Sequence, residues 1–237
     1  MDDIAADIPA ADAARTVRDA LLSRRSVRAF LSTQVPQSLI GELLSLAARA
    51  PSGGNIQPWK VHVVFGRAKT ELEKDLLATA ADKNGGGRPE YDYYPRQWWE
   101  PYASRRSEIG LALYGTLGIG KRDVAARRAQ HMRNFAFFGA PAGLFFCVER
   151  ALTAGSWLDV GMFLQSFMLA AREAGLHTCP QAAFTSHHEV VRRHLAIPDG
   201  DILLCGMALG YEDTTRPENA LRSPRAPLDQ FVRFHGD

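Results

Sequence analysis

Residues 156–174 carry apolar side chains on nearly every side of a helix, and this feature constrains the fold more than any other. A helix of this kind is buried, either at the centre of a domain or within an assembly. Other apolar stretches, such as 135–148, are broken by glycine and proline and fall short of the about 20 residues that cross a bilayer. The sequence therefore predicts a globular fold around a central helix, with no membrane partner.

Length and charge narrow the class of protein. The chain has 237 residues, 46% hydrophobic and 23% charged, so it can bury a core and is neither disordered nor a coiled coil. Its 28 basic and 26 acidic residues give a net charge of +2, too balanced for a protein held to nucleic acid by electrostatics. Since no repeat or long linker divides the chain, we expect residues 1–237 to form a single domain.

The three cysteines, Cys147, Cys179 and Cys205, are widely spaced and predict neither a disulfide framework nor a metal site. Residues 1–14 carry acidic side chains where a secretory signal carries basic ones, and they lack its apolar core. We therefore expect a cytoplasmic protein.

The spacing of apolar residues predicts more helix than strand. Helices are expected at 11–24, 36–50, 67–82, 102–118, 121–137, 156–174 and 186–195, and strands at 59–65, 141–148, 176–180 and 202–210. These elements predict an α+β fold with several short strands.

An aromatic-rich insert, at about 83–118, interrupts this pattern. Loop-forming residues at 83–90 are followed by the sequence Tyr91-Asp-Tyr-Tyr-Pro-Arg-Gln-Trp-Trp-Glu100. Two interpretations remain open: the insert is a lid over a ligand site, or it packs on its own subunit or on a partner.

Familiar catalytic motifs are absent: the sequence contains no GxSxG, HExxH or phosphate-binding P-loop motif. The pair His187 and His188 opens a predicted helix and points in two directions, which favours a surface or capping role over metal binding. Cys179 precedes a proline without an evident base, which favours a structural role.

Two polar segments are better candidates for a binding site. Ser23-Arg-Arg-Ser-Val-Arg28 offers three guanidinium groups, which could bind a phosphate or the edge of a flat heterocycle. Taken alone, this run also fits a solvated helix end. In Ala50-Pro-Ser-Gly-Gly-Asn-Ile-Gln-Pro-Trp59, the glycines let a flat ligand approach the backbone, and amide side chains lie beside them.

Two further segments could contribute to the same site. Thr178-Cys-Pro-Gln-Ala-Ala183 follows a predicted strand, where backbone amides can face a crevice. Arg222-Ser-Pro-Arg-Ala-Pro-Leu-Asp229 is held extended by its prolines and could present Arg225 to an anion. Taken singly, each segment also fits a purely structural role.

Together and in this order, the four segments resemble the flavin-dependent nitroreductase family. The sequences RRSVR, PSGGNIQPW, CGMALGY and RxPL are similar to its signatures, and the likeness covers most of residues 20–234. The Tyr-Trp insert, the sequence Tyr114-Gly-Thr-Leu-Gly118 and residues 134–141 resemble its nitrobenzoate reductase-like branch. The resemblance implies a nitroreductase-like α+β fold, with a central, mostly antiparallel sheet flanked by helices. It also implies an intertwined homodimer whose C-terminal tail, at about 219–237, crosses to the partner.

The resemblance also implies an FMN in each of two clefts at the dimer interface. The arginine-rich run and Arg225 would hold its phosphate and pyrimidine edge, the glycine loop would come from the partner subunit, and residues 180–182 would lie along the ring near N5. The implied cofactor-binding residues are Arg24, Arg25, Ser26, Arg28, Pro51, Ser52, Gly53, Asn55, Pro180, Gln181, Ala182 and Arg225. The substrate-binding candidates are Tyr94, Arg96, Trp98, Trp99 and Arg105, beside Tyr91 and Tyr93.

The activity implied is the reduction of a nitroaromatic compound, such as a nitrobenzoate, by NADH or NADPH. The two substrates would use the same cleft in turn, exchanging electron pairs through flavin N5, so no side-chain acid or nucleophile is needed. Arg96 or Arg105 could pair with a carboxylate on the aromatic ring. A reductive dehalogenase or enone reductase on the same fold, or a non-enzymatic flavin-binding protein, are the alternatives.

Overall fold

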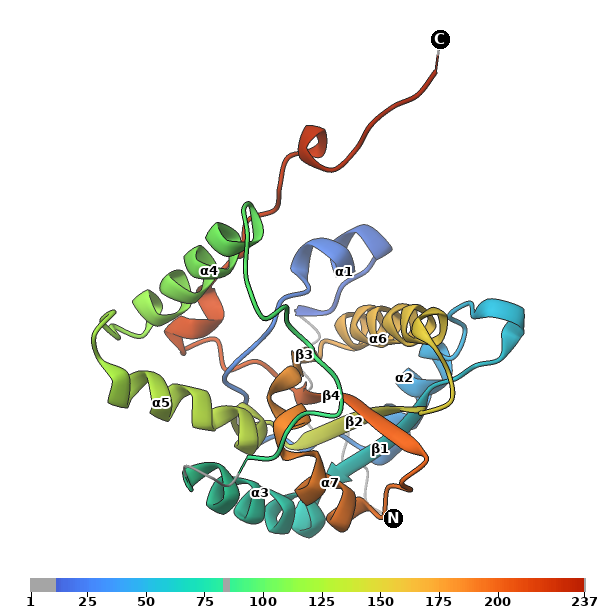
Figure 1. The fold of residues 1–237 in the computed structure, drawn as a ribbon, viewed down its shortest axis with the longest axis horizontal. Helices are drawn as coiled ribbons and strands as arrows, with labels where there is room; N and C mark the ends of the chain where they lie inside the picture. Colours follow the sequence, from blue (N-terminus) through green and yellow to red (C-terminus); the bar gives the residue numbers. More distant parts are fainter. Residues whose placement is uncertain (1–11, 83–85, 237) are drawn as a thin grey trace.

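The computed structural model describes residues 12–82 and 86–236 (Figure 1), so the expectations for residues 1–11, 83–85 and 237 lie outside the described residues. At its centre is a four-stranded sheet in the order β1-β2-β4-β3, in which every neighbouring pair is antiparallel. Its strands are β1 (Lys60–Phe65), β2 (Ala142–Glu149), β3 (His177–Gln181) and β4 (Asp201–Gly210). The predicted α+β class with an antiparallel sheet is confirmed.

The two central strands, β2 and β4, are apolar because both faces of the sheet are covered. Successive side chains of a strand point to opposite faces, so β2 contributes to two cores. Leu144 and Phe146 belong to the core on one face, and Phe145 and Cys147 belong to the core on the other.

Each face of the sheet is covered by its own set of helices (Figure 1). On one face, α2 (Gln37–Ala47) and α6 (Ala154–Glu173) pack against the sheet. On the other face lie α3 (Gly66–Ala81), α7 (His188–Leu195) and the irregular turns at 133–139.

Three peripheral helices complete the described chain: α1 (Val17–Ser23), α4 (Tyr102–Thr116) and α5 (Val124–Met132). Helix α4 buries none of its residues, and the C-terminal tail extends away from the body (Figure 1). Within the described ranges, no helix is both long and apolar enough to cross a membrane.

Two expectations about helices were wrong in detail. The helix expected at 121–137 ends at Met132, because the rings of Phe137 and Phe138 turn into the core with φ values of 47° and 57°. The opening helix starts at Val17 rather than at residue 11. The side chain of Thr16 caps it by accepting a hydrogen bond from the Asp19 amide. Within a single chain, helix α6 buries one side and leaves Leu158 72% exposed, so burial of its other side in an assembly stays a prediction.

We predict that Gly143→Ala destabilises the protein by about 1–3 kcal/mol, the usual cost of overpacking a core. A Cβ at this position of β2 would lie 2.3 Å from the ring of Phe137, which is fully buried. The measurement is urea unfolding, with Gly115→Ala as the control, because a Cβ there would meet nothing within 4 Å. Equal stability of the two variants would contradict this account of the core.

Candidate functional site

The arginine-rich run, the end of β3 and the start of the C-terminal tail lie side by side. Ser26 pairs with Thr178 in a parallel bridge, and the Val27 amide donates to the Thr178 carbonyl at 3.1 Å. The Arg28 amide donates to Asn219 Oδ1 at 2.8 Å. Three of the four segments selected from the sequence are therefore brought together along one edge of the sheet.

Arg24 and Arg225, from opposite ends of the chain, are close enough to repel each other. Burial and the neighbouring charge of Arg225 lower the pKa of Arg24. Arg225 donates only to oxygens of Ser223 and Pro224, and neither arginine has an acidic partner among residues 12–82 and 86–236. Two neighbouring guanidinium groups without a counter-charge form a site suited to an anion.

Arg25 differs from its neighbours because the protein itself uses its donors. Its guanidinium forms an ion pair with Glu212, whose side chain is 4% exposed, and donates to the carbonyls of Asn219 at 3.2 Å and Ser23 at 3.1 Å. These contacts fasten the arginine-rich run to the residues that follow β4. All three guanidinium nitrogens of Arg25 therefore contact groups of the fold itself.

His177 and Arg172, both buried, lie beside this ion pair together with the exposed Asp12. Arg172 Nη1 lies 3.3 Å from His177 Nδ1, which must accept because a guanidinium only donates. His177 Nε2 lies 3.2 Å from an Asp12 oxygen and 3.4 Å from a Glu212 oxygen, without the alignment of a hydrogen bond. The side chains of Asp12, His177 and Glu212 are close enough together to surround a metal ion. However, Arg172 and Arg25 already balance the charges of the two carboxylates.

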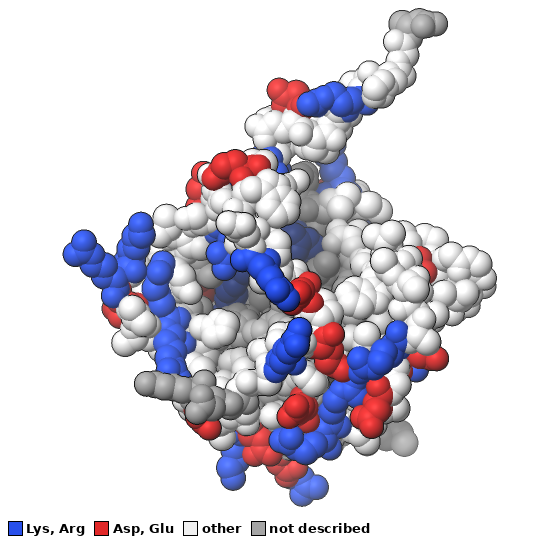
Figure 2. All heavy atoms as spheres, viewed as in Figure 1, with Lys and Arg blue, Asp and Glu red and all other residues white. Residues whose placement is uncertain are grey.

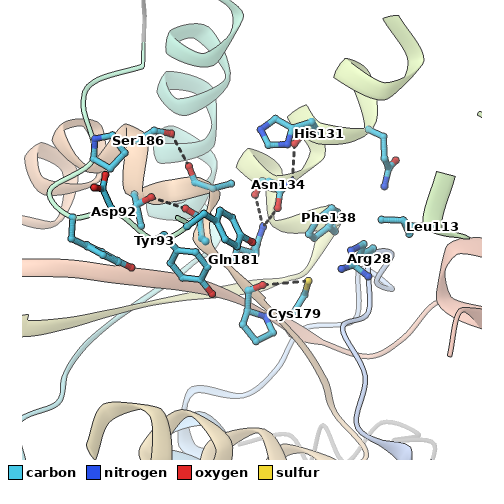
Figure 3. Close-up of a pocket in the computed structure, with 18 of the residues that line it drawn as sticks. Arg28, Asp92, Tyr93, Leu113, His131, Asn134, Phe138, Cys179, Gln181 and Ser186 are labelled. Carbon is cyan, nitrogen blue, oxygen red and sulfur yellow. Dashed lines mark hydrogen bonds between the residues drawn. The ribbon is translucent and has the colours of Figure 1, made fainter. Parts of the chain in front are cut away.

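A cavity of about 560 Å³ opens between the end of β3 and the insert (Figure 3). The predicted residues that line it are Arg28, Tyr91, Tyr93, Tyr94, Pro180, Gln181 and Ala182. Several other residues that line the cavity were not among the predicted site residues: Asp92, Leu113, Tyr114, Gln130, His131, Asn134, Phe138, Ala183, Thr185 and Ser186. Tyr114, Asn134 and Phe138 belong to segments that carried the family resemblance, but their place at the cavity depends on how α4, α5 and the 133–139 turns pack on the sheet.

The start of the insert packs on its own subunit, as one of the two interpretations expected. The hydroxyl of Tyr91 donates to the Leu204 carbonyl, its ring meets Trp157 edge-on at 4.8 Å, and burial raises its pKa. Beyond this anchor, Tyr93 and Tyr94 remain about half exposed at the cavity. The insert thus combines a fixed base with an open aromatic wall.

The other substrate-binding candidates lie outside the large cavity. Arg105 lines a second cavity of about 440 Å³, together with Arg222 and Arg225, and donates to Gln230 Oε1 at 2.8 Å. Arg96, Trp98 and Trp99 line neither of these two cavities. Their role in substrate binding stays a prediction.

The glycine loop does not join the arginines within one chain. The Gly53 amide lies 3.3 Å from an Asp159 oxygen on α6, and Ser52 Oγ accepts from the Gln57 amide at 3.0 Å. Pro51, Gly53 and Asn55 are exposed, and the loop lines neither cavity. The space-filling view shows basic side chains deep in a hollow below the C-terminal tail (Figure 2).

The chain is similar to known proteins both in sequence and in fold. Residues 21–211 match the sequence model of the Nitroreductase family. The chain is 40% identical to the 4-nitrobenzoate reductase of Nocardioides sp. (strain LMS-CY), over 100% of this chain and 96% of the relative. The chain therefore belongs to the nitroreductase family.

Two solved structures are also similar. The FMN- and NADPH-dependent nitroreductase NfnB from Sphigopyxis sp. strain HMH has a TM-score of 0.91 and 40% identity, covering 94% of this chain and 100% of that one. The FMN-dependent nitroreductase NfnB from Mycobacterium smegmatis, solved with NADPH, has a TM-score of 0.88 and 31% identity, covering 92% and 97%. The predicted nitroreductase-like fold is thereby confirmed.

We predict that His177 makes the protein less stable in mild acid. Burial and the charges of Arg172, Arg25 and Arg222 lower its pKa to about 3, whereas an unfolded histidine titrates near 6.5. Only the unfolded state takes up the proton as the pH falls from 7 to 5, so stability should fall by about 2 kcal/mol.

Urea unfolding at pH 7 and pH 5, at one protein concentration, measures this loss. His177→Gln should lose about 2 kcal/mol less than the wild type over the same pH step, because glutamine does not titrate. The same loss in both proteins would show that other groups govern the pH dependence.

Proposed function

We propose that this protein is an FMN-dependent oxidoreductase that uses NADH or NADPH to reduce nitroaromatic compounds. One observation carries the proposal: Arg24 and Arg225 lie close together without a counter-charge among the described residues, and Arg28 of the same run lines the large cavity. Family membership and the printed activities of the relatives support it. The proposal includes a cytoplasmic location. The three cysteines are unpaired and buried, as expected in that reducing compartment.

The residues present fit this cofactor. FMN joins a flat ring to a phosphate that carries up to about two negative charges. Arg24, Ser26 and Arg225 would hold the phosphate, and Arg28 would donate to the pyrimidine edge. Arg25 would orient its neighbours through its ion pair rather than touch the cofactor.

Residues 180–182 would lie along the ring, since they line both the large cavity and a smaller one of about 350 Å³ on the other side of the Tyr91–Tyr93 segment. The backbone N–H groups of Gln181 and Ala182 would face N5, whereas Pro180 has no N–H to offer. A cation at the pyrimidine edge stabilises the negative charge that reduction adds, which gives Arg28 an electrostatic role.

When bound, FMN would supply the two-electron redox chemistry that connects a nicotinamide donor to a nitro group. The chain's own residues bind and orient the reactants. Tyr93 and Tyr94 offer aromatic faces on which a nitroarene ring can stack. Arg96 or Arg105 would pair with a carboxylate of the substrate.

A homodimer completes the proposed site. Apolar side chains of α1 and α6 stay exposed in the single chain: Val17, Leu21 and Leu22 are 71%, 52% and 74% exposed, and Leu158 is 72% exposed. Exposed apolar surface of this kind is typical of subunit interfaces. The exposed glycine loop and the part of the tail beyond Arg225 would then serve the neighbouring subunit.

We predict that the purified protein, loaded with FMN, is bleached anaerobically by NADH or NADPH and recovers its colour when 4-nitrobenzoate or nitrobenzene is added. A preference for the carboxylated compound would indicate that an arginine recognises the carboxylate. A protein that does not bind FMN contradicts the proposal. Reoxidation by a halophenol or an enone alone would favour a dehalogenase or enone reductase, and no faster reduction than free FMN would favour a flavin-binding protein without activity.

We predict that mixed dimers of Arg225→Ala and Ser52→Tyr chains regain one intact flavin site of two. If the loop serves the partner's arginines, both defects fall in one cleft and leave the other complete. Each homodimer should bind FMN more weakly, by a few kcal/mol for Arg225→Ala, because a charge-assisted contact is worth about 1.5–3 kcal/mol. Equilibrium titration measures the number of tight sites, and mixed dimers without a tight site would place loop and arginines in the same chain.

A further inference from the structure

Gln181, the last residue of β3, has a buried acceptor without a donor. Its side chain is almost inaccessible, at 3% exposure, and lines the large cavity. Its Nε2 donates to the backbone carbonyl of Asn134 at 2.8 Å and lies 3.3 Å from Asn134 Oδ1. Its Oε1 accepts no hydrogen bond from any residue in the described ranges 12–82 and 86–236.

The orientation of this amide is fixed by its neighbour. A backbone carbonyl only accepts, so the amide nitrogen of Gln181 must face Asn134 and the oxygen must turn away from it. Figure 3 shows Gln181 beside Asn134 in the cavity, with Tyr93 and Phe138 nearby. A buried acceptor is costly to leave unpaired, so this oxygen marks where a ligand donates.

The chemistry of the proposed reactants narrows the choice of donor. A nitro group and a carboxylate offer only acceptors, so a nitrobenzoate cannot satisfy Gln181. The oxidised isoalloxazine ring carries one N–H, the imide N3–H of its pyrimidine edge, between two carbonyl oxygens. Arg28 lines the same cavity and supplies donors suited to those carbonyls.

We infer that Gln181 Oε1 accepts the N3–H of FMN, so that a side chain at the end of β3 recognises the imide of the cofactor. This inference rests on the proposed function and adds a side-chain contact to the expected backbone contacts of residues 180–182. It makes Gln181 a binding and positioning residue, because a contact at N3 fixes how far the ring enters the cavity.

The test compares FMN with 3-methyl-FMN, in which a methyl group replaces the N3 proton and the phosphate is unchanged. Apoprotein is titrated with each flavin, and the quenching of flavin fluorescence gives both dissociation constants. The wild type should bind FMN about 10- to 100-fold more tightly, the range expected when a buried acceptor loses its donor. In Gln181→Met, which keeps the length of the side chain without its acceptor, the two constants should agree within about threefold.

Gln130→Met is the matched control. Gln130 also lines the cavity and is 9% exposed, but its Oε1 faces Arg133 at 3.4 Å and its Nε2, which has no partner among the described residues, is a donor. It cannot accept N3–H, so this variant should keep the wild-type preference for FMN. A preference that survives in Gln181→Met, or disappears in Gln130→Met, overturns the inference.

A second measurement needs no variant. The N3 proton of ¹⁵N-labelled FMN bound to the wild type should give a sharp amide resonance with slow solvent exchange, and an exchange-broadened N3 proton would contradict the contact. Tight FMN binding with equal affinity for 3-methyl-FMN refutes the role of Gln181 and leaves the proposed function standing. Failure to bind either flavin refutes the proposed function itself.

Discussion

The ion pair between Arg25 and Glu212 holds the candidate site together. It fastens the arginine-rich run to Glu212, two residues beyond β4, and the Asn219 side chain reinforces the junction by binding both Arg28 and Ala29. Because the pair is buried, losing one partner would leave an uncompensated charge, which is far more costly than losing a surface pair.

The arginines of this run divide their work according to their surroundings. Arg25 has acceptors within the fold, whereas Arg24 and Arg225 lack acidic partners among the described residues. Leaving like charges together costs stability, and an anionic ligand recovers it. The same argument applies to Gln181 Oε1, which is neutral. No donor for this oxygen is present among the described residues, whereas a flavin can supply one.

Sequence reasoning succeeded where a signal was local. Apolar residues at strand spacing predicted β2 and β4, and the arginine-rich run could be recognised from its composition. It failed where distant packing overrode local preference: Phe137 and Phe138 leave the helix expected at 121–137 because their rings fill the core beneath the sheet. It also could not find Asn134 or Gln130, which become part of the site only through the way their elements pack.

The sequence alone determined the order of the protein's elements, its fold class and the chemical groups available for a flavin phosphate. Each of these depends on periodicity or on residue type. Which arginine is free and which is bound was decided by the tertiary structure, because the difference lies in the position of Glu212, 187 residues away along the chain. The direction of the Gln181 amide was decided in the same way, by a carbonyl 47 residues away. The sequence shows that a charged or amide side chain is present, but only the tertiary structure determines whether that side chain binds another part of the protein or a ligand.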